Sequence, residues 1–165
     1  MKTFLKYLPA LLFFILISQG AGVIGSIFTV RSINTWYEGL NKPTFNPPNW
    51  IFGPAWTLLY LAMGIAAYIV WRNGWSKREV KVALIVFAFQ LVLNALWSII
   101  FFGMRAPLAG FIEIFFLWAA ILATLILFWR ISLAAGLLLL PYIGWVSFAA
   151  LLNYYLWRLN PQGPA

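Results

Sequence analysis

Long uninterrupted runs of apolar residues dominate the chain. Four of these runs contain no charged residue, namely 7–30, 50–71, 82–104 and 131–157. A fifth run, 106–129, contains a single charge, Glu113. Each run exceeds the roughly 18–20 residues that an α-helix needs to cross the hydrocarbon core of a bilayer. The pattern therefore predicts an all-α membrane protein in which residues 1–165 form a single domain, a bundle of five transmembrane helices.

The composition agrees with this prediction and narrows the chemistry. Hydrophobic residues make up 64% of the 165 residues and charged residues 8%, whereas soluble domains have about 45–50% and about 25%. The chain has no His and no Cys, which excludes disulfides, Cys/His zinc sites, thiolate nucleophiles and Ser-His-Asp triads. We therefore expect no metal site and no required cofactor.

The net charge of +8 does not indicate a nucleic-acid-binding protein. The few cations lie between long uncharged runs rather than in one patch that could follow a phosphate backbone. We expect the protein to contact the lipid bilayer and not to bind nucleic acid.

The first apolar run has some features of a cleavable signal peptide. Lys2 and Lys6 precede an apolar core, and small residues follow at 18–22. The apolar stretch nevertheless continues to Val30, which is longer than a signal core. We interpret it as a retained transmembrane helix.

The distribution of cations predicts the orientation of a multi-pass protein. Most connections between the runs are short, so neighbouring helices should be antiparallel. Lys and Arg on the amino-terminal side outnumber those on the other side by seven to four. The positive-inside rule then places the amino terminus in the cytoplasm.

One connection, 31–49, is longer and rich in proline and aromatic residues. Its three prolines restrict the backbone and lower the cost of ordering it, while Trp36, Tyr37 and Phe45 provide apolar surface to bury. We expect a structured lid over the helix ends. The alternative is a belt of aromatic residues at the level of the lipid headgroups.

Polar and aromatic side chains at helical spacing identify the inner faces of three helices. These stripes are Trp56 and Tyr60, then Gln90, Asn94, Trp97 and Phe101, and finally Trp145, Ala149 and Asn153. Flat rings beside a few amides are what a planar, mostly apolar ligand requires. The alternative is ordinary packing, with the amides as hydrogen-bonding links between helices.

Three further features have both a functional and a packing interpretation. Glu113 is the only acidic residue within a run, and it lies near a helix end, where it could also snorkel or hydrogen-bond a neighbour. Small residues spaced by four, Ser18/Gly22 and Ala21/Gly25, suit either packing within the bundle or a dimer interface. The ending Leu152-Asn153-Tyr154-Tyr155-Leu156-Trp157-Arg158 fits a weak pattern proposed for cholesterol contact.

A set of uncommon residues at fixed spacing carries a resemblance to a known family. The set includes Trp36-Tyr37, Lys42-Pro43, Pro47-Pro48, Trp50, Phe52, Pro54, Trp56-Thr57, Leu59-Tyr60, Gln90, Leu93-Asn94, Trp97, Phe101-Phe102-Gly103, Pro141-Tyr142, Trp145 and Asn153. In these residues the chain resembles the tryptophan-rich sensory protein (TspO/MBR) family, which includes the mitochondrial translocator protein, or peripheral benzodiazepine receptor. The resemblance covers nearly the whole chain and implies a five-helix membrane bundle, commonly dimeric.

The resemblance also implies a ligand site. It implies binding of porphyrins and benzodiazepine-type ligands in a cavity under the first loop, and of sterols in animal members. By matching position, the cavity would be lined by Tyr37, Pro47, Trp56, Tyr60, Asn94, Trp97, Trp145 and Ala149. The sterol motif of the family would fall on Tyr154, Tyr155 and Arg158, and Trp56 and Trp145 match tryptophans linked to light-dependent porphyrin breakdown.

Three classes of function follow from these observations. The leading hypothesis is a membrane receptor or regulator that binds tetrapyrroles, with porphyrin as its ligand. The second is an enzyme that degrades protoporphyrin in light, for which Trp56 and Trp145 would be the catalytic residues. The third is a tetrapyrrole or sterol transporter, although the chain lacks the repeated halves and paired ionisable residues typical of secondary transporters.

Overall fold

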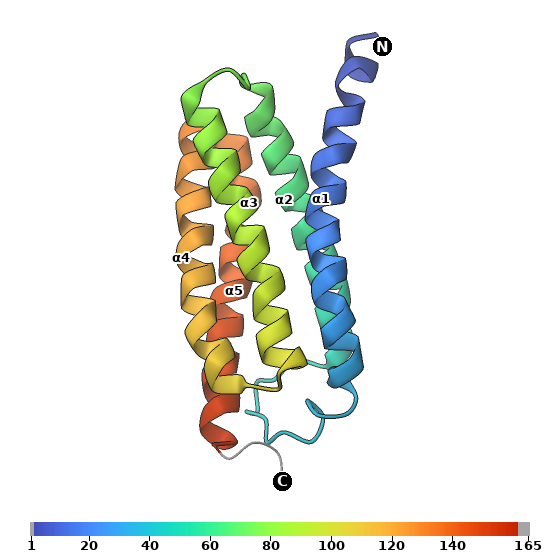
Figure 1. Cartoon of the computed structure of the whole chain (residues 1–165), viewed down its shortest axis with the longest axis vertical. Helices are drawn as coiled ribbons and strands as arrows, with labels where there is room; N and C mark the ends of the chain where they lie inside the picture. The colour runs from blue at the N-terminus through green and yellow to red at the C-terminus, as the bar shows by residue number, and fades with distance from the viewer. Residues whose placement is uncertain (1, 162–165) are drawn as a thin grey trace.

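The computed structural model describes residues 2–161, which form a bundle of five long α-helices (Figure 1). The helices are α1 (Lys2–Ile33), α2 (Phe52–Arg72), α3 (Arg78–Ser98), α4 (Pro107–Ile131) and α5 (Leu133–Leu159). A 3₁₀ turn, η1 (Asn49–Ile51), leads into α2, and a π-helical turn, η2 (Ile99–Gly103), extends α3. All five helices are long and apolar enough to cross a membrane. The predicted fold class is confirmed.

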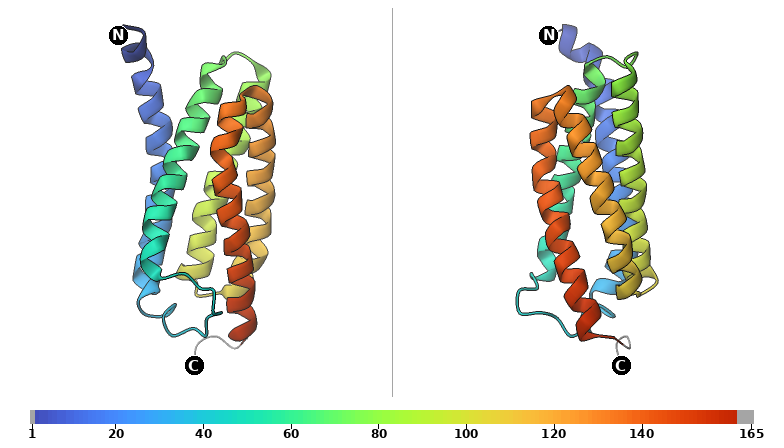
Figure 2. Two further views of the ribbon diagram at one scale, coloured as in Figure 1. Left: turned by 180° about the vertical axis from the view of Figure 1, so that it is seen from behind. Right: turned by 90° about the vertical axis from the view of Figure 1, so that its left-hand side faces the viewer.

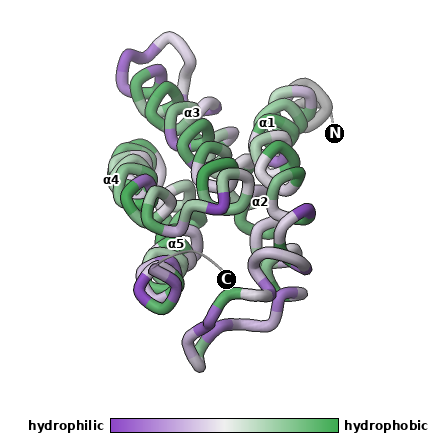
Figure 3. The backbone as a smooth tube through the Cα atoms, turned by 60° about the horizontal axis from the view of Figure 1, so that its bottom comes forward, coloured by the Kyte–Doolittle hydropathy of each residue, from purple (hydrophilic) through white to green (hydrophobic). Residues whose placement is uncertain are grey.

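Successive helices run in opposite directions along the long axis of the bundle. The start of α1, the α2–α3 turn and the α4–α5 connection lie at one end, and the long connection after α1 lies at the other end with the end of α5 (Figures 1 and 2). Helix α4 packs along α3 and α5, while α1 packs on α2 and α3. The hydrophilic positions gather mainly toward the two ends, and hydrophobic positions predominate between them (Figure 3), as expected for a bundle surrounded by lipid.

Backbone geometry sets the sharp reversals between helices. Gly74 has a φ of 121° in the α2–α3 turn, a conformation that a side chain would disfavour. Pro107 begins α4, where its missing amide hydrogen leaves no helical hydrogen bond unmade. A single extended residue, Ser132, separates α4 from α5, so the two helices fold directly back on one another.

Close contacts at small residues hold α1 against its neighbours. A Cβ atom added at Gly64 of α2 would lie 2.7 Å from the Cα atom of Ile15, so the two backbones meet without an intervening side chain. A Cβ atom at Gly25 would lie 2.9 Å from the Oγ atom of Ser98, and one at Gly22 would overlap the ring of Tyr60. Gly22 and Gly25 therefore take part in packing within the bundle.

The connection between α1 and η1 packs against the helix ends. Trp36, Tyr37 and Leu40 are buried in a cluster with residues of η2 and α5. The backbone of Asn41 exchanges two hydrogen bonds with the Asn160 side chain, both of 2.9 Å. These contacts hold the connection over the end of the bundle as a lid.

Candidate functional site: an aromatic cavity beneath the lid

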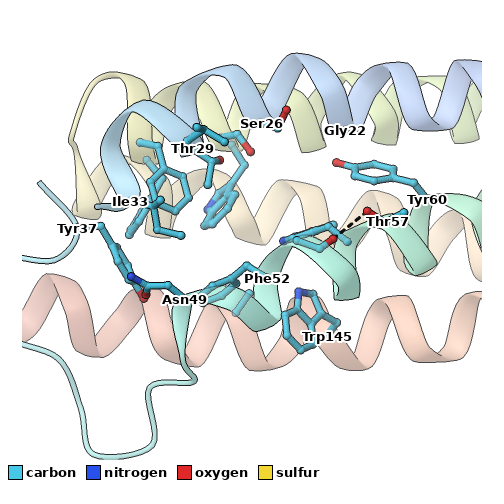
Figure 4. Close-up of a pocket in the computed structure, with 18 of the residues that line it drawn as sticks. Gly22, Ser26, Thr29, Ile33, Tyr37, Asn49, Phe52, Thr57, Tyr60 and Trp145 are labelled. Carbon is cyan, nitrogen blue, oxygen red and sulfur yellow. Dashed lines mark hydrogen bonds between the residues drawn. The ribbon is translucent and has the colours of Figure 1, made fainter. Parts of the chain in front are cut away.

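A cavity of about 420 Å³ lies beneath the lid, between α1, α2, α5 and the end of α3 (Figure 4). Aromatic side chains from the lid and three helices make up much of its wall. They include Tyr37, Phe52, Trp56, Tyr60, Trp97 and Trp145. The volume lies within the range of about 300–1,000 Å³ that is typical of small-molecule sites.

Neighbouring rings hold the indoles of the wall in place. Trp56 stacks on Tyr60, with ring centroids 5.5 Å apart and an interplanar angle of 30°. Trp145 meets Phe52 edge to face at 6.2 Å. Trp97 lies nearly parallel to the ring of Phe101, at 5.1 Å and 13°. Because each indole packs on another ring, the wall presents flat surfaces that are set before a ligand arrives.

Helix α1 supplies a polar side of the cavity that was not among the inner faces predicted from the sequence. Gln19, Gly22, Ser26 and Thr29 line the cavity. The hydroxyl groups of Ser26 and Thr29 donate to carbonyl oxygens of their own helix, at 2.8 and 3.2 Å, which satisfies them in an apolar setting. The spacing of these four residues places them on one helical face. This spacing is the sequence pattern from which the polar side of the cavity could have been predicted.

The cavity is open on the side between α1 and α2. Val23 and Val30 of α1 are 60% and 70% exposed, and Trp50 on the opposite side is 73% exposed, although all three line the cavity. The Gln19 side chain donates to the Thr57 carbonyl oxygen at 3.1 Å and links the two helices deeper in the bundle. The exposed lining residues therefore lie on the side of the bundle, where a surrounding bilayer would contact them.

A buried chain of hydrogen bonds supports the inner end of the cavity. The Tyr60 hydroxyl donates to Asn94 Oδ1. The Asn94 amide donates to the Tyr142 hydroxyl at 2.8 Å, which in turn donates to Gln90 Oε1 at 2.8 Å. These bonds join α2, α3 and α5, and all four side chains are buried. Of the four, only Tyr60 lines the cavity.

Comparisons with known proteins identify the family. The TspO/MBR family model matches residues 14–158. The chain belongs to the TspO/MBR family. It is 51% identical to the tryptophan-rich protein TspO of Archaeoglobus fulgidus over 140 residues, which cover 84% of this chain and 89% of the relative. It is 38% identical to the human translocator protein over 156 residues, covering 93% and 91% of the two chains.

Most of the cavity residues expected from the TspO/MBR resemblance come together in the wall. Tyr37, Trp56, Tyr60, Trp97, Trp145 and Ala149 all line the cavity. Asn94 lies behind the wall in the hydrogen-bonded chain, and Pro47 lies outside the lining set. Sequence position alone did not separate a residue that faces the cavity from one that faces a neighbouring helix.

Two asparagines that the TspO/MBR resemblance did not place in the cavity also line it. Asn49 comes from η1, directly after the lid. Asn153 accepts a hydrogen bond from Trp97 Nε1 at 3.2 Å and donates to the Pro107 carbonyl oxygen at 2.8 Å. Asn153 thus orients the Trp97 indole and anchors α5 to the start of α4.

The Tyr37 hydroxyl group joins two parts of the lid. The Tyr37 hydroxyl donates to Asn46 Oδ1 at 2.6 Å, and the Lys42 ammonium lies 5.2 Å from the centre of its ring. Burial raises the pKa of the Tyr37 hydroxyl above its usual range. The hydroxyl therefore remains protonated at physiological pH and keeps its donor role.

The residues that match the sterol motif lie outside the cavity, near the end of α5. Tyr154 packs against Phe111 of α4, with ring centroids 5.4 Å apart. Tyr155 packs against Phe45 of the lid at 5.3 Å. The Arg158 guanidinium lies 5.7 Å from the centre of the Trp157 ring. This set contacts α4 and the lid, and it does not line the cavity.

Glu113 is buried in α4 and separate from the cavity lining. Both of its carboxyl oxygens lack a hydrogen-bond partner within residues 2–161. Neither the snorkelling nor the hydrogen-bonding alternative describes its position. The described part of the chain also contains no group of acidic, His or Cys side chains that could hold a metal.

Proposed function

We propose that this protein is a membrane receptor that binds a planar tetrapyrrole, with porphyrin as the ligand, in the cavity beneath the lid. The supporting observation is that Trp56 of α2 and Trp145 of α5 both line one aromatic cavity. Flat apolar rings offer stacking surface, and Asn49 and Asn153 offer hydrogen bonds at the edge. Sterols and benzodiazepine-type molecules are the other flat, apolar ligands we propose for the same wall.

The opening between α1 and α2 supports a ligand that partitions into lipid. Hydrophobic porphyrins and sterols accumulate in the bilayer, and the exposed side of the cavity faces that phase. A ligand can then enter from the membrane without crossing the lid. The proposal is therefore of a receptor that samples the bilayer for its ligand.

Free-base protoporphyrin is expected to bind at least as tightly as haem. The chain has no His or Cys to serve as a strong axial ligand, and the buried Met63 is not part of the cavity lining. The lining tyrosines, Tyr37 and Tyr60, are less usual iron ligands, and their hydroxyls already donate to Asn46 and Asn94. Parallel fluorescence-quenching titrations of the purified protein with protoporphyrin, haem and a sterol would measure this. Haem bound a hundredfold more tightly, with a six-coordinate low-spin spectrum, would contradict the proposal.

A second candidate function is light-dependent degradation of protoporphyrin. The observation that favours it is the position of two readily oxidised indoles, Trp56 and Trp145, in the lining of one cavity. A new absorption spectrum of the bound porphyrin after illumination would support an enzyme, whereas reversible quenching alone supports a receptor. Ligand flux across sealed proteoliposomes would instead support the third candidate, a transporter.

We propose that the amino terminus faces the cytoplasm. The end of the bundle with the α2–α3 turn carries Arg72, Lys77, Arg78 and Lys81, and cytoplasmic ends of membrane proteins are enriched in Lys and Arg. Reporter fusions at both termini should show an amino terminus inside and a carboxyl terminus outside. A carboxyl-terminal reporter active in the cytoplasm would contradict this orientation.

We also propose that the protein assembles as a homodimer, as its family membership implies. Gly22 and Gly25 pack against Tyr60 and Ser98 inside the bundle, which favours a dimer interface elsewhere. A dimer would use another lipid-facing surface.

A further inference from the structure

A second hollow lies on the outer surface of the bundle, at the end opposite the lid. Helices α1 and α3 diverge toward the α2–α3 turn (Figure 1), and a groove of about 780 Å³ lies there. Its walls are apolar side chains that include Phe13 and Ile17 of α1 and Ile85 of α3. These three side chains are 44–68% exposed, so the groove is open to lipid along its length.

The end of the groove nearest the α2–α3 turn is amphipathic and cationic. Lys81 and Trp75 line this end, and both are exposed. Arg72, Lys77 and Arg78 are exposed in the same short segment, whose only acidic residue is Glu79. Tryptophan and lysine at the end of an apolar groove mark the level of the lipid headgroups.

We propose that this groove is a binding site for an anionic phospholipid of the surrounding leaflet. An acyl chain lies along the apolar walls between α1 and α3. The phosphate of the headgroup lies at Lys81, within the excess positive charge of the α2–α3 turn. Basic pockets between transmembrane helices recognise acidic headgroups because the bilayer interface strengthens the attraction between unlike charges.

Charge favours a lipid over a second copy of the chain as the occupant. Copies in one membrane share an orientation, so a partner seated in the groove would bring its own four cations to the same level. The two sets of four cations would then lie close together and repel each other. A lipid phosphate at Lys81 instead lowers the local positive charge.

Native mass spectrometry of the full chain in detergent tests this site. The probes are phosphatidylglycerol and phosphatidylcholine with identical acyl chains. We expect phosphatidylglycerol to bind more tightly to the unmodified protein. Lys81→Gln should reduce that preference about fivefold, which corresponds to about 1 kcal/mol for one cation near an anionic surface. Ala88→Trp, which fills the groove from an exposed position in its wall, should abolish it.

Matched controls separate the groove from general effects. Arg130→Gln removes an exposed cation at the end of α4, and Ala119→Trp adds a bulky ring to the exposed face of α4. Both controls should keep the preference for phosphatidylglycerol. Equal binding of the two lipids, or the same loss in Lys81→Gln and Arg130→Gln, would overturn the site. A dimer that dissociates in Ala88→Trp with unchanged lipid binding would assign the groove to a second copy, also overturning it.

Discussion

Trp56→Ala and Trp145→Ala are each expected to weaken porphyrin binding about 10- to 100-fold. Each change removes an indole that lines the cavity, and with it the stacking and apolar burial that the ring provides. Together these are worth about 1.5–3 kcal/mol at a buried aromatic site. Fluorescence-quenching titrations in the dark measure the effect. Trp75→Ala is the control, because Trp75 is exposed in the turn at the opposite end.

The corresponding phenylalanine variants distinguish a receptor from a light-dependent enzyme. Trp→Phe at 56 or 145 keeps a ring in the wall and removes the readily oxidised indole. If the protein degrades porphyrin through these indoles, the light-driven spectral change should fall much more than the dark affinity. If it only binds, illumination should leave all variants spectrally alike.

One result would remove both proposals for the cavity. Unchanged dark affinity in both alanine variants would place the ligand elsewhere. The aromatic stripes of α2 and α5 would then serve packing alone. The lipid site between α1 and α3 would be unaffected, because its test uses neither porphyrin nor these two residues.

Asn94→Leu is expected to lower the free energy of unfolding by about 1–3 kcal/mol. The substitution removes the acceptor of the Tyr60 hydroxyl and the donor to the Tyr142 hydroxyl. The buried Tyr60 hydroxyl then loses its acceptor, and an unsatisfied buried donor destabilises the folded state. Each 1 kcal/mol corresponds to about 2–4 °C for a chain of this size. Thermal unfolding of the detergent-solubilised protein measures the loss.

A double variant tests whether the lost hydrogen bond is the cause. Tyr60→Phe combined with Asn94→Leu removes both partners and should recover part of the lost stability. Asn73→Ala, at the exposed end of α2, should leave the melting temperature nearly unchanged. A melting temperature of Asn94→Leu equal to that of the unmodified protein would show that the buried chain does not stabilise the bundle.

The inner faces of the helices were predictable because their signal is local. A polar side chain in a lipid-facing run costs free energy, so Gln90, Asn94 and Asn153 marked faces that the structure buries. The same rule applied to α1 would have found the cavity-lining positions 19, 22, 26 and 29. Their small or weakly polar side chains gave a fainter pattern than an amide beside a tryptophan.

The sequence did not predict which helix or cavity each inner face would contact. Asn94 and Trp97 belong to one stripe of α3, yet Trp97 lines the cavity and Asn94 bonds to two tyrosines behind it. Tyr142, at the centre of that chain, entered the sequence pattern only as part of the family resemblance, and no helical stripe placed it on an inner face. Periodicity defines a direction around one helix axis, whereas these contacts depend on the tilt and separation of three helices.

The sequence by itself determined the five membrane helices and their antiparallel order, because hydropathy and chain connectivity act over neighbouring residues. The tertiary structure decided the rest. It joined Asn41 to Asn160 across 119 positions of the chain, opened one cavity between α1 and α2, and left the carboxyl oxygens of Glu113 without a partner within residues 2–161. Each of these outcomes depends on how close separate helices pack, and that distance is set by contacts between side chains far apart in the sequence.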